Sequence, residues 1–217
     1  MGPHFLVIAG LMGKISKRIF DISISLLAIM LLTPVFVVIA IFIRMTGKGP
    51  TIFRQERTGK DGKSFVFYKF RTMKCDVDPL ALSPTSSDDP RLTKIGKFLR
   101  ECSLDELPQL FNILKGDMSI VGPRPLFIWQ MEKWDDRQKK RLLVKPGLTG
   151  LAQISGRGEV THEEKLELDV KYVETAGFWL DIKIILATIA QVFKRKNIYE
   201  KRYSQTKFTR RQDSNCT

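Results

Sequence analysis

The sequence predicts an α+β fold that is mostly helical, in which a hydrophobic membrane helix precedes one small domain with short strands. The residues from Ile22 to Ile43 carry no charge. Apolar residues recur at helical spacing in several later segments, whereas strand-like alternation is confined to short runs. A chain of 217 residues with 43% apolar residues suits one domain plus attachments. We expect boundaries at 1–16 (N-terminal lead), 17–46 (membrane helix), 47–196 (domain) and 197–217 (basic tail).

The charge balance favours anionic partners. The chain has 36 Lys and Arg against 23 Asp and Glu, a net charge of +13, which suits nucleic acid, an anionic bilayer surface or phosphorylated small molecules. Its 3 cysteines have no close pairing, so neither a disulfide framework nor a zinc site is indicated, and a reducing, cytosolic location fits. With only 2 histidines, a His-based zinc centre or a Ser-His-Asp triad is disfavoured.

The uncharged segment is long enough to cover a hydrocarbon core, because a helix of this length rises roughly 33 Å. Thr33-Pro34 near its middle predicts a bend, since proline lacks a backbone donor, and we expect the Thr33 hydroxyl to bond a freed carbonyl. Basic residues flank both ends, and the positive-inside rule therefore assigns both flanks to the cytoplasmic face. A helix that bends at Pro34 and returns satisfies this rule; a kinked ordinary span is the alternative.

Two short strands follow, Thr51–Phe53 and Ser64–Phe70, joined by a hairpin-like loop. Lys69 lies in the second strand, where it either faces a ligand or forms a solvated edge. The segment Asp76–Pro90 lacks periodicity and is rich in Asp, Ser and Pro, which predicts a mobile loop and a candidate lid.

A helix over Arg91–Cys102 leads into Ser103–Leu110, where the adjacent carboxylates Asp105 and Glu106 are enclosed by apolar residues. Ser103-x-x-Glu106 also fits a capping box, in which the two side chains only cap a helix. On a helix the carboxylates would be about 100° apart, so a catalytic pair would have different roles: one a nucleophile, the other a metal ligand or proton carrier.

Basic residues gather around this stretch in sequence, which favours a phosphate-binding site. They include Lys69, Arg100 and Arg124. Arg124 lies between Pro123 and Pro125, which restrict the backbone and lower the entropy lost when the guanidinium binds a phosphate. The alternative is a loop with a chance arginine.

The C-terminal half predicts a charged helix over Gln130–Leu143, a tight turn over Lys145–Gly150 and a helix over Thr161–Glu174. Glycines flanking Arg157 permit close approach of the backbone to a ligand. Asp169 is either a site residue or one more acid on a solvated helix face.

A last amphipathic helix has an apolar stripe from Ile182 to Phe193 and a basic end. It suits either a core or the headgroup region of an anionic membrane, and we favour the membrane. The polar, basic tail after Asn197 is expected to be disordered.

Seven motifs, in this order, resemble the bacterial sugar transferases, the monotopic phosphoglycosyl transferases that move a sugar 1-phosphate from a nucleotide sugar to polyprenyl phosphate. The resemblance runs from about Lys17 to Lys196. The motifs are Lys17–Asp21, Tyr68–Met73, Ser103–Leu110, Leu114–Ser119, Gly122–Pro125, Lys145–Gly150 and Glu167–Val170. Larger members carry extra spanning helices and another domain, so the expected form here is the minimal, single-domain one.

The resemblance implies that Asp105 attacks a UDP-sugar, expelling UMP and retaining a sugar phosphate that polyprenyl (undecaprenyl) phosphate then takes up in a ping-pong reaction. This is the first membrane step of bacterial glycoconjugate assembly. Glu106 would handle a proton or, with Asp105, bind the Mg²⁺ that the family requires. Arg100 and Arg124, with Lys69, would hold phosphate oxygens.

The resemblance also implies a re-entrant helix bent at Thr33-Pro34, with the catalytic domain on the cytoplasmic face of the bacterial inner membrane. The expected partners are the UDP-sugar, polyprenyl phosphate and anionic lipid of the inner leaflet, with no nucleic acid and a homodimer left open. Two motifs depart from the family: Thr33-Pro34 replaces Ser-Pro, and Ser155–Gly158 replaces Asn-Gly-Arg-Asn, which leaves the nucleotide or sugar contacts of Arg157 open.

A protein of another class is the alternative: a noncatalytic, membrane-anchored binder of anionic lipid or nucleic acid. It accounts for the charge but not for paired carboxylates beside Arg124.

Overall fold

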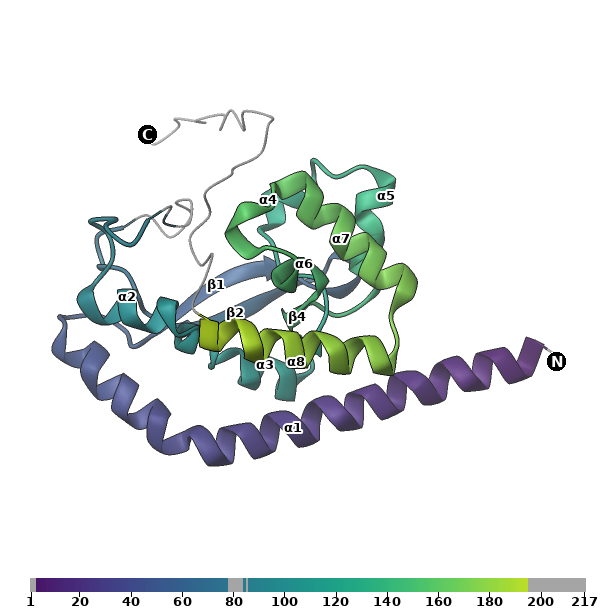
Figure 1. Ribbon diagram of the computed structural model, residues 1–217, viewed down its shortest axis with the longest axis horizontal. Coiled ribbons are helices and arrows are strands. Elements are labelled where there is room, and N and C mark those ends of the chain that lie inside the picture. Colours follow the sequence, from purple (N-terminus) through teal and green to yellow (C-terminus); the bar gives the residue numbers. More distant parts are fainter. Residues whose placement is uncertain (1–2, 78–83, 85, 195–217) are drawn as a thin grey trace.

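The computed structural model describes residues 3–77, 84 and 86–194; within this range, the side chains of residues 3–12, 14 and 157 are not described. The architecture is helical with short strands, as the sequence predicts (Figure 1). In chain order the elements are α1 (Pro3–Met45), β1 (Ile52–Thr58), η1 (Lys60–Gly62), β2 (Ser64–Phe70), α2 (Lys94–Glu101), η2 (Leu104–Glu106), α3 (Gln109–Lys115), β3 (Ser119–Val121), α4 (Ile128–Met131), α5 (Asp136–Lys139), η3 (Lys140–Leu143), β4 (Gly147–Thr149), α6 (Leu151–Ile154), η4 (Arg157–Glu159), α7 (His162–Thr175) and α8 (Phe178–Lys194).

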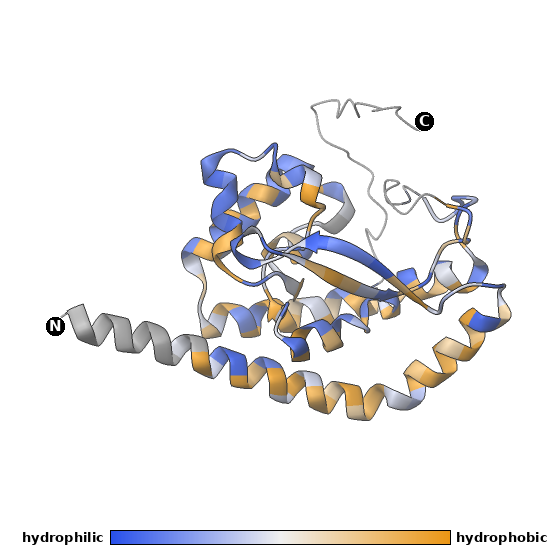
Figure 2. Ribbon diagram, turned by 180° about the vertical axis from the view of Figure 1, so that it is seen from behind, coloured by the Kyte–Doolittle hydropathy of each residue, from blue (hydrophilic) through white to orange (hydrophobic). Residues whose placement is uncertain are grey.

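Helix α1 lies along one side of the domain and bends along its length (Figures 1 and 2). Its segment Ile15–Met45 is the one helix among the described residues that is long and apolar enough to cross a membrane. Pro34 lies inside it. The Thr33 hydroxyl donates to the carbonyl of Ile29 at 2.7 Å. That carbonyl also faces the Thr33 amide in a helix, so the expectation that the hydroxyl bonds the carbonyl freed by Pro34 is wrong in this detail.

Polar contacts tie the N-terminal part of α1 to the domain. The Arg18 guanidinium donates to the carbonyls of Ile113 and Leu114 at 2.6 and 2.8 Å, which caps the C-terminus of α3. The carboxylate of Asp21 accepts from the amide of Ile120 at 3.1 Å. Lys17 pairs with the buried Asp181 of α8 at 2.5 Å.

The C-terminal end of α1 contacts the same domain. Ile39 and Ile43 are buried against Phe70 of β2 and Leu99 of α2. The buried guanidinium of Arg71 donates to the carbonyl of Ile43 at 3.2 Å. Both ends of the apolar segment are therefore fixed to one body.

Strands β1 and β2 form an antiparallel hairpin that pairs Ile52 with Phe70 and Thr58 with Ser64. The second strand is confirmed, whereas the first extends to Thr58 and not only to Phe53. Buried Asn112 of α3 accepts from the amide of Tyr68 at 3.1 Å and donates to the carbonyl of Val66 at 2.6 Å. These two hydrogen bonds fix α3 against the hairpin.

The turn predicted over Lys145–Gly150 is wrong, because Gly147–Thr149 forms strand β4, parallel to β3. Glycines make this pairing possible. A Cβ on Gly147 would lie 2.7 Å from the Cα of Gly122, closer than any side chain permits. The pairing places Gly122 and the following Pro123 beside β4.

The single helix predicted over Gln130–Leu143 is also wrong, since α4, α5 and η3 divide this segment. Trp134 is buried between α4 and α5, and Asp135 starts a new helix by accepting from the amide of Gln138 at 2.7 Å. The helix predicted over Thr161–Glu174 is confirmed as α7, and the Thr161 hydroxyl accepts from the amide of Glu164 at its N-terminus.

Helix α8 presents much of its predicted apolar stripe outward. Leu186, Ile189 and Phe193 are 61%, 50% and 82% exposed. The face toward the domain carries Asp181 and Ile184, both buried. Core packing is therefore wrong for these three residues of the stripe, whereas Ile185 packs against the hydrophobic core.

Candidate active site

The carboxylate pair lies in η2, the short turn between α2 and α3. Helix α2 stops after Glu101, and Ser103 has a φ of 56°, in the left-handed region, so the chain changes direction before Leu104. The Ser103 side chain makes no capping hydrogen bond within the described residues. The capping-box alternative is wrong for Ser103.

Asp105 is buried, with only 7% of its surface exposed. Burial, together with the adjacent charge of Glu106, raises the pKa of Asp105 to about 6. Lys69, Arg100 and Arg124 act in the opposite direction, because their charges favour the carboxylate. Asp105 is thus a poorly solvated carboxylate among cations, a suitable environment for a nucleophile.

Lys69 of β2 and Arg100 of α2 lie close enough for their charges to act on this carboxylate. Burial, then the charge of Arg100, lowers the pKa of Lys69 to about 8, so the ammonium is still protonated at neutral pH. The Arg100 Nε donates to the hydroxyl of Thr72 at 3.0 Å, which fixes the direction of the guanidinium. The solvated-edge alternative for Lys69 is wrong.

Glu106 pairs with Arg124 at 2.8 Å. Burial opposes ionisation of Glu106, but the charge and hydrogen bond of Arg124 outweigh it and lower the pKa of Glu106. The two carboxylates therefore have different environments: Asp105 is buried among cations, and Glu106 is paired with Arg124.

Pro123 and Pro125 are buried on either side of the exposed Arg124. A small, open hollow lies beside them, lined by Thr58, Gly59, Pro123, Arg124, Arg141, Leu142, Val144 and Pro146. The side chain of Arg124 is 48% exposed and so remains accessible to a ligand while it pairs with Glu106.

Asp169 is not on a solvated face, since it is 2% exposed. Its carboxylate accepts from Arg141 at 2.6 Å, and Arg141 also donates to the backbone carbonyl of Arg124 at 2.6 Å. Asp169 thus contacts the site through Arg141. Arg141 was not among the predicted site residues, because in the sequence it is one more cation within the charged run Gln130–Leu143.

Three predictions fall partly or wholly outside the described residues. The first concerns ligand contacts of Arg157, whose side chain is not described, although its backbone lies in η4. The lid predicted over Asp76–Pro90 includes residues 78–83 and 85, and the tail predicted to be disordered is likewise not described.

The donor set at Asp105 and Glu106 fits Mg²⁺, which proteins bind through one or two carboxylates together with substrate phosphates and water. No group of three or more His, Cys, Asp or Glu side chains that could hold a metal occurs among the described residues. Any metal would therefore need ligands from a bound phosphate as well as from these two carboxylates.

Comparison with known proteins gives one matching family model and several relatives. Residues 12–195 match the model of the family described as bacterial sugar transferase. Galactosyl transferase CpsE of Streptococcus agalactiae serotype III is 45% identical over 190 residues, 82% of this chain and 42% of that protein. The UDP-glucose:undecaprenyl-phosphate glucose-1-phosphate transferase of Escherichia coli K12 is 42% identical over 195 residues, 86% of this chain and 42% of that protein.

A shorter relative matches over most of its length. The uncharacterized sugar transferase EpsL of Bacillus subtilis strain 168 is 42% identical over 187 residues, 86% of this chain and 91% of that protein. The chain thus spans less than half of the first two relatives and nearly all of the third. Because the family match covers most of the chain and includes the carboxylate pair, the cations around it and the polar contacts of α1, this chain belongs to the bacterial sugar transferase family.

Proposed function

We propose that the protein transfers a sugar 1-phosphate from a UDP-sugar to polyprenyl (undecaprenyl) phosphate and releases UMP. One observation carries the proposal: the buried carboxylate of Asp105 lies among Lys69, Arg100 and the Glu106–Arg124 pair. Relatives named for UDP-glucose:undecaprenyl-phosphate glucose-1-phosphate transfer and for undecaprenyl-phosphate galactose phosphotransfer support the same substrate class.

In the first half-reaction, a carboxylate oxygen of Asp105 attacks the phosphorus that carries the sugar. A bond forms between this oxygen and phosphorus, the diphosphate bridge breaks, and its electron pair leaves with UMP. The enzyme then carries an aspartyl phosphosugar. Ionised Asp105 is the reactive form, and its pKa of about 6 makes it largely ionised at neutral pH.

The surrounding cations supply the electrostatic stabilisation that a carboxylate needs to approach a diphosphate. Lys69 and Arg100 hold oxygens of the transferred phosphoryl group, while Arg124 exchanges part of its contact with Glu106 for a phosphate oxygen. A divalent cation bound by Asp105 and Glu106 together with the substrate phosphates would offset further negative charge.

In the second half-reaction, an oxygen of polyprenyl phosphate attacks the phosphorus of the intermediate, and Asp105 leaves as a carboxylate. Glu106 is the carboxylate that we assign to accept a proton from the incoming phosphate. UMP departs before the lipid reacts, so the kinetics are ping-pong.

The contacts of α1 support a re-entrant membrane helix. Arg18 near one end of the apolar segment and Ile43 at the other both bond to groups of the same domain. A straight span would put these ends on opposite faces, about 30 Å apart. We therefore infer a protein attached to one membrane face, the cytoplasmic face of the bacterial inner membrane, with the outward apolar side of α8 in the headgroup region.

The test is the identity of the nucleotide released. Purified protein is incubated with Mg²⁺ and a panel of UDP-sugars that includes UDP-glucose and UDP-galactose, with and without polyprenyl phosphate. UMP is the expected product, and a stoichiometric burst without lipid is the expected sign of the covalent intermediate. Release of UDP would indicate direct glycosyl transfer, and release of neither nucleotide would favour the noncatalytic binder.

A further inference from the structure

Arg57 is a cation of the site that the predicted phosphate-binding residues do not include. In the register of the hairpin, Arg57 pairs with Phe65, and Lys69 pairs with Phe53. Paired residues, and residues two apart along a strand, lie on the same side of a sheet. Arg57 and Lys69 therefore project from the same face of the hairpin, toward the carboxylate pair.

The guanidinium of Arg57 is held in one place. It lies over the ring of Phe127, 3.6 Å from the ring centroid, and its Nη2 donates to the side-chain oxygen of Gln55 at 2.6 Å. Gln55 is itself buried. Such a fixed planar cation loses little further entropy when it binds an anion.

One donor of this guanidinium has nothing to bond to. The Nε of Arg57 is buried and makes no hydrogen bond within the described part of the chain. A buried donor of a charged group is costly to leave unpaired, so it normally indicates an absent partner. The partner that suits a guanidinium Nε–H is an anionic oxygen.

The surrounding charges favour that anion. Arg57 lies close enough to Arg124 and Glu106 for both charges to influence it, and close enough to Lys69 to influence that ammonium. With Arg100, these residues place four cations around the two carboxylates Asp105 and Glu106. The phosphates of a bound diphosphate would offset this excess of positive charge.

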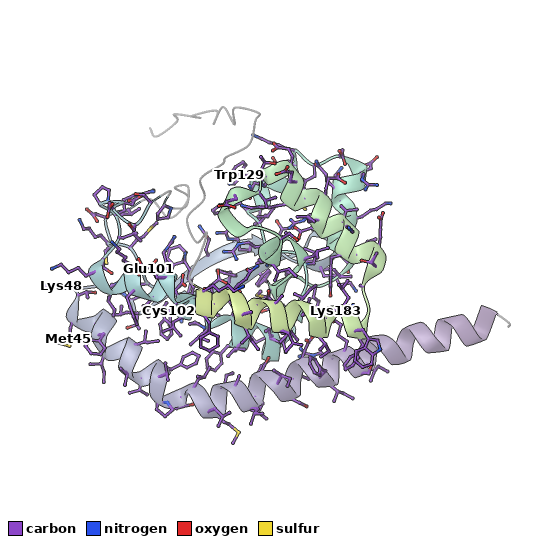
Figure 3. The ribbon with its side chains drawn as sticks, viewed as in Figure 1. Met45, Lys48, Glu101, Cys102, Trp129 and Lys183 are labelled. Atoms are coloured by element: carbon purple, nitrogen blue, oxygen red, sulfur yellow. The ribbon has the colours of Figure 1, made fainter. Side chains whose placement is uncertain are left out.

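The position of Phe127 indicates which substrate supplies the phosphate that Arg57 would bind. Phe127 precedes α4 and stacks on Trp129, with ring centroids 5.9 Å apart. Figure 3 shows Trp129 on the side of the domain opposite α1, whereas Lys48 and Lys183 lie near that helix. In the proposed membrane orientation, a lipid phosphate enters from the α1 side and the water-soluble substrate approaches from the α4 side.

We infer that Arg57 binds the leaving phosphate of the nucleotide, with its Nε–H on a phosphate oxygen, while Phe127 and Gln55 position the guanidinium. This inference rests on the proposed function. The inference adds a residue that binds the phosphate of UMP and stabilises its negative charge as UMP departs. Lys69 and Arg100 are left for the phosphoryl group that is transferred.

The experiment measures UMP binding by calorimetry to the whole protein in detergent, together with KM for the UDP-sugar and for polyprenyl phosphate. Arg57→Gln should weaken UMP binding about 10- to 100-fold, the effect of losing one charge-assisted hydrogen bond. The KM for the UDP-sugar should rise, and the KM for polyprenyl phosphate should not change. Arg57→Lys should be intermediate, since it keeps the charge but not the planar fork.

Arg54→Gln is the matched control. Arg54 is on the same strand, lies over the ring of Tyr68 and is exposed, but it pairs with Tyr68 on the opposite face of the hairpin. Its loss should leave UMP binding within about twofold of the wild type. The salt dependence of UMP binding should become shallower in Arg57→Gln only, which a purely structural role of Arg57 would not produce.

The outcomes separate this inference from the proposed function. If both Arg57 variants bind UMP as tightly as the wild type, or if only the KM for polyprenyl phosphate rises, the inference is overturned. If Arg57→Gln does not fold, the same criteria apply to Arg57→Lys. A wild type that binds UMP but never forms it from a UDP-sugar overturns the proposed function alone.

Discussion

The guanidinium of Arg141 connects Asp169 to Arg124: a single nitrogen donates at 2.6 Å both to the carboxylate of Asp169 and to the backbone carbonyl of Arg124. Each side chain of the ion pair is 3% exposed. Asp169→Asn leaves a buried cation without its counterion. We expect the free energy of unfolding to fall by about 3–5 kcal/mol and the activity to fall through the displacement of Arg124. Chemical unfolding and kcat/KM measure the two effects.

Glu167→Gln is the control for that prediction. Glu167 lies on the same helix and pairs with Arg137 at 3.0 Å, but both side chains are about half exposed. Solvent screens such pairs, so the change in unfolding free energy should stay below about 1 kcal/mol. Equal effects of the two substitutions would contradict a special role for the buried pair.

Asp105→Asn should abolish UMP release and make the protein more stable at pH 8. The folded-state pKa of Asp105, about 6, exceeds the ordinary value of 3.8, so its ionisation opposes folding. This cost is absent below about pH 4 and complete above about pH 6. At pH 8 the variant should gain about 1–3 kcal/mol, and the gain should shrink toward pH 4. Unfolding at both pH values checks this; a variant less stable at pH 8 would contradict it.

The pH dependence of kcat/KM should be bell-shaped. Activity should fall below about pH 6, as Asp105 becomes protonated, and above about pH 8, as Lys69 loses its charge. Lys69→Arg should remove the alkaline limb without moving the acid limb, because arginine stays protonated throughout. An unchanged alkaline limb in this variant would assign it to another group.

Two isoleucines of α8 provide a matched pair. Ile184 is fully buried, and Ile189 is 50% exposed. Ile184→Ala should lower the free energy of unfolding by about 2–5 kcal/mol. Ile189→Ser should leave stability within about 0.5 kcal/mol but weaken binding to vesicles that contain anionic lipid. Unchanged vesicle binding in Ile189→Ser would argue against membrane contact at this face.

The bend of α1 predicts where its two ends lie. Single cysteines placed at the exposed positions Gly13 and Lys48, in a background without the natural cysteines, should react with an impermeant maleimide from the same side of the membrane. Pro34→Leu restores the missing helical donor and should favour a straight span, with the two sites on opposite sides. Labelling from opposite sides in the unaltered helix would rule out re-entry.

Local pattern was enough for the features that depend on neighbours in sequence. The strand Ser64–Phe70 and the helix α7 follow from strand-like alternation and from apolar residues at helical spacing, and the uncharged run Ile22–Ile43 predicts the apolar part of α1. The identity of the carboxylate pair came from the order of motifs. The structure adds that Asp105 is buried while Glu106 has an arginine partner.

The features that were missed depend on contacts distant in sequence. The segment around Gly147 has the composition of a turn. It nevertheless forms part of a sheet, because it pairs with a strand that begins at Ser119. Neither Arg57 nor Arg141 was among the predicted site residues, because nothing nearby in sequence indicates that Phe127 and Asp169 contact them. Burial of a cation is a tertiary property, and a single sequence does not encode it locally.

Ile39 and Ile43 occupy the same hydrophobic cluster as Phe70 and Leu99, so the membrane segment also serves as an interior wall of the domain. Deleting it to obtain a water-soluble enzyme would uncover the strand that carries Lys69 and the helix that carries Arg100. Such a truncated product should aggregate and lack activity. Detergent, nanodiscs or native vesicles are therefore the media in which this protein has to be studied.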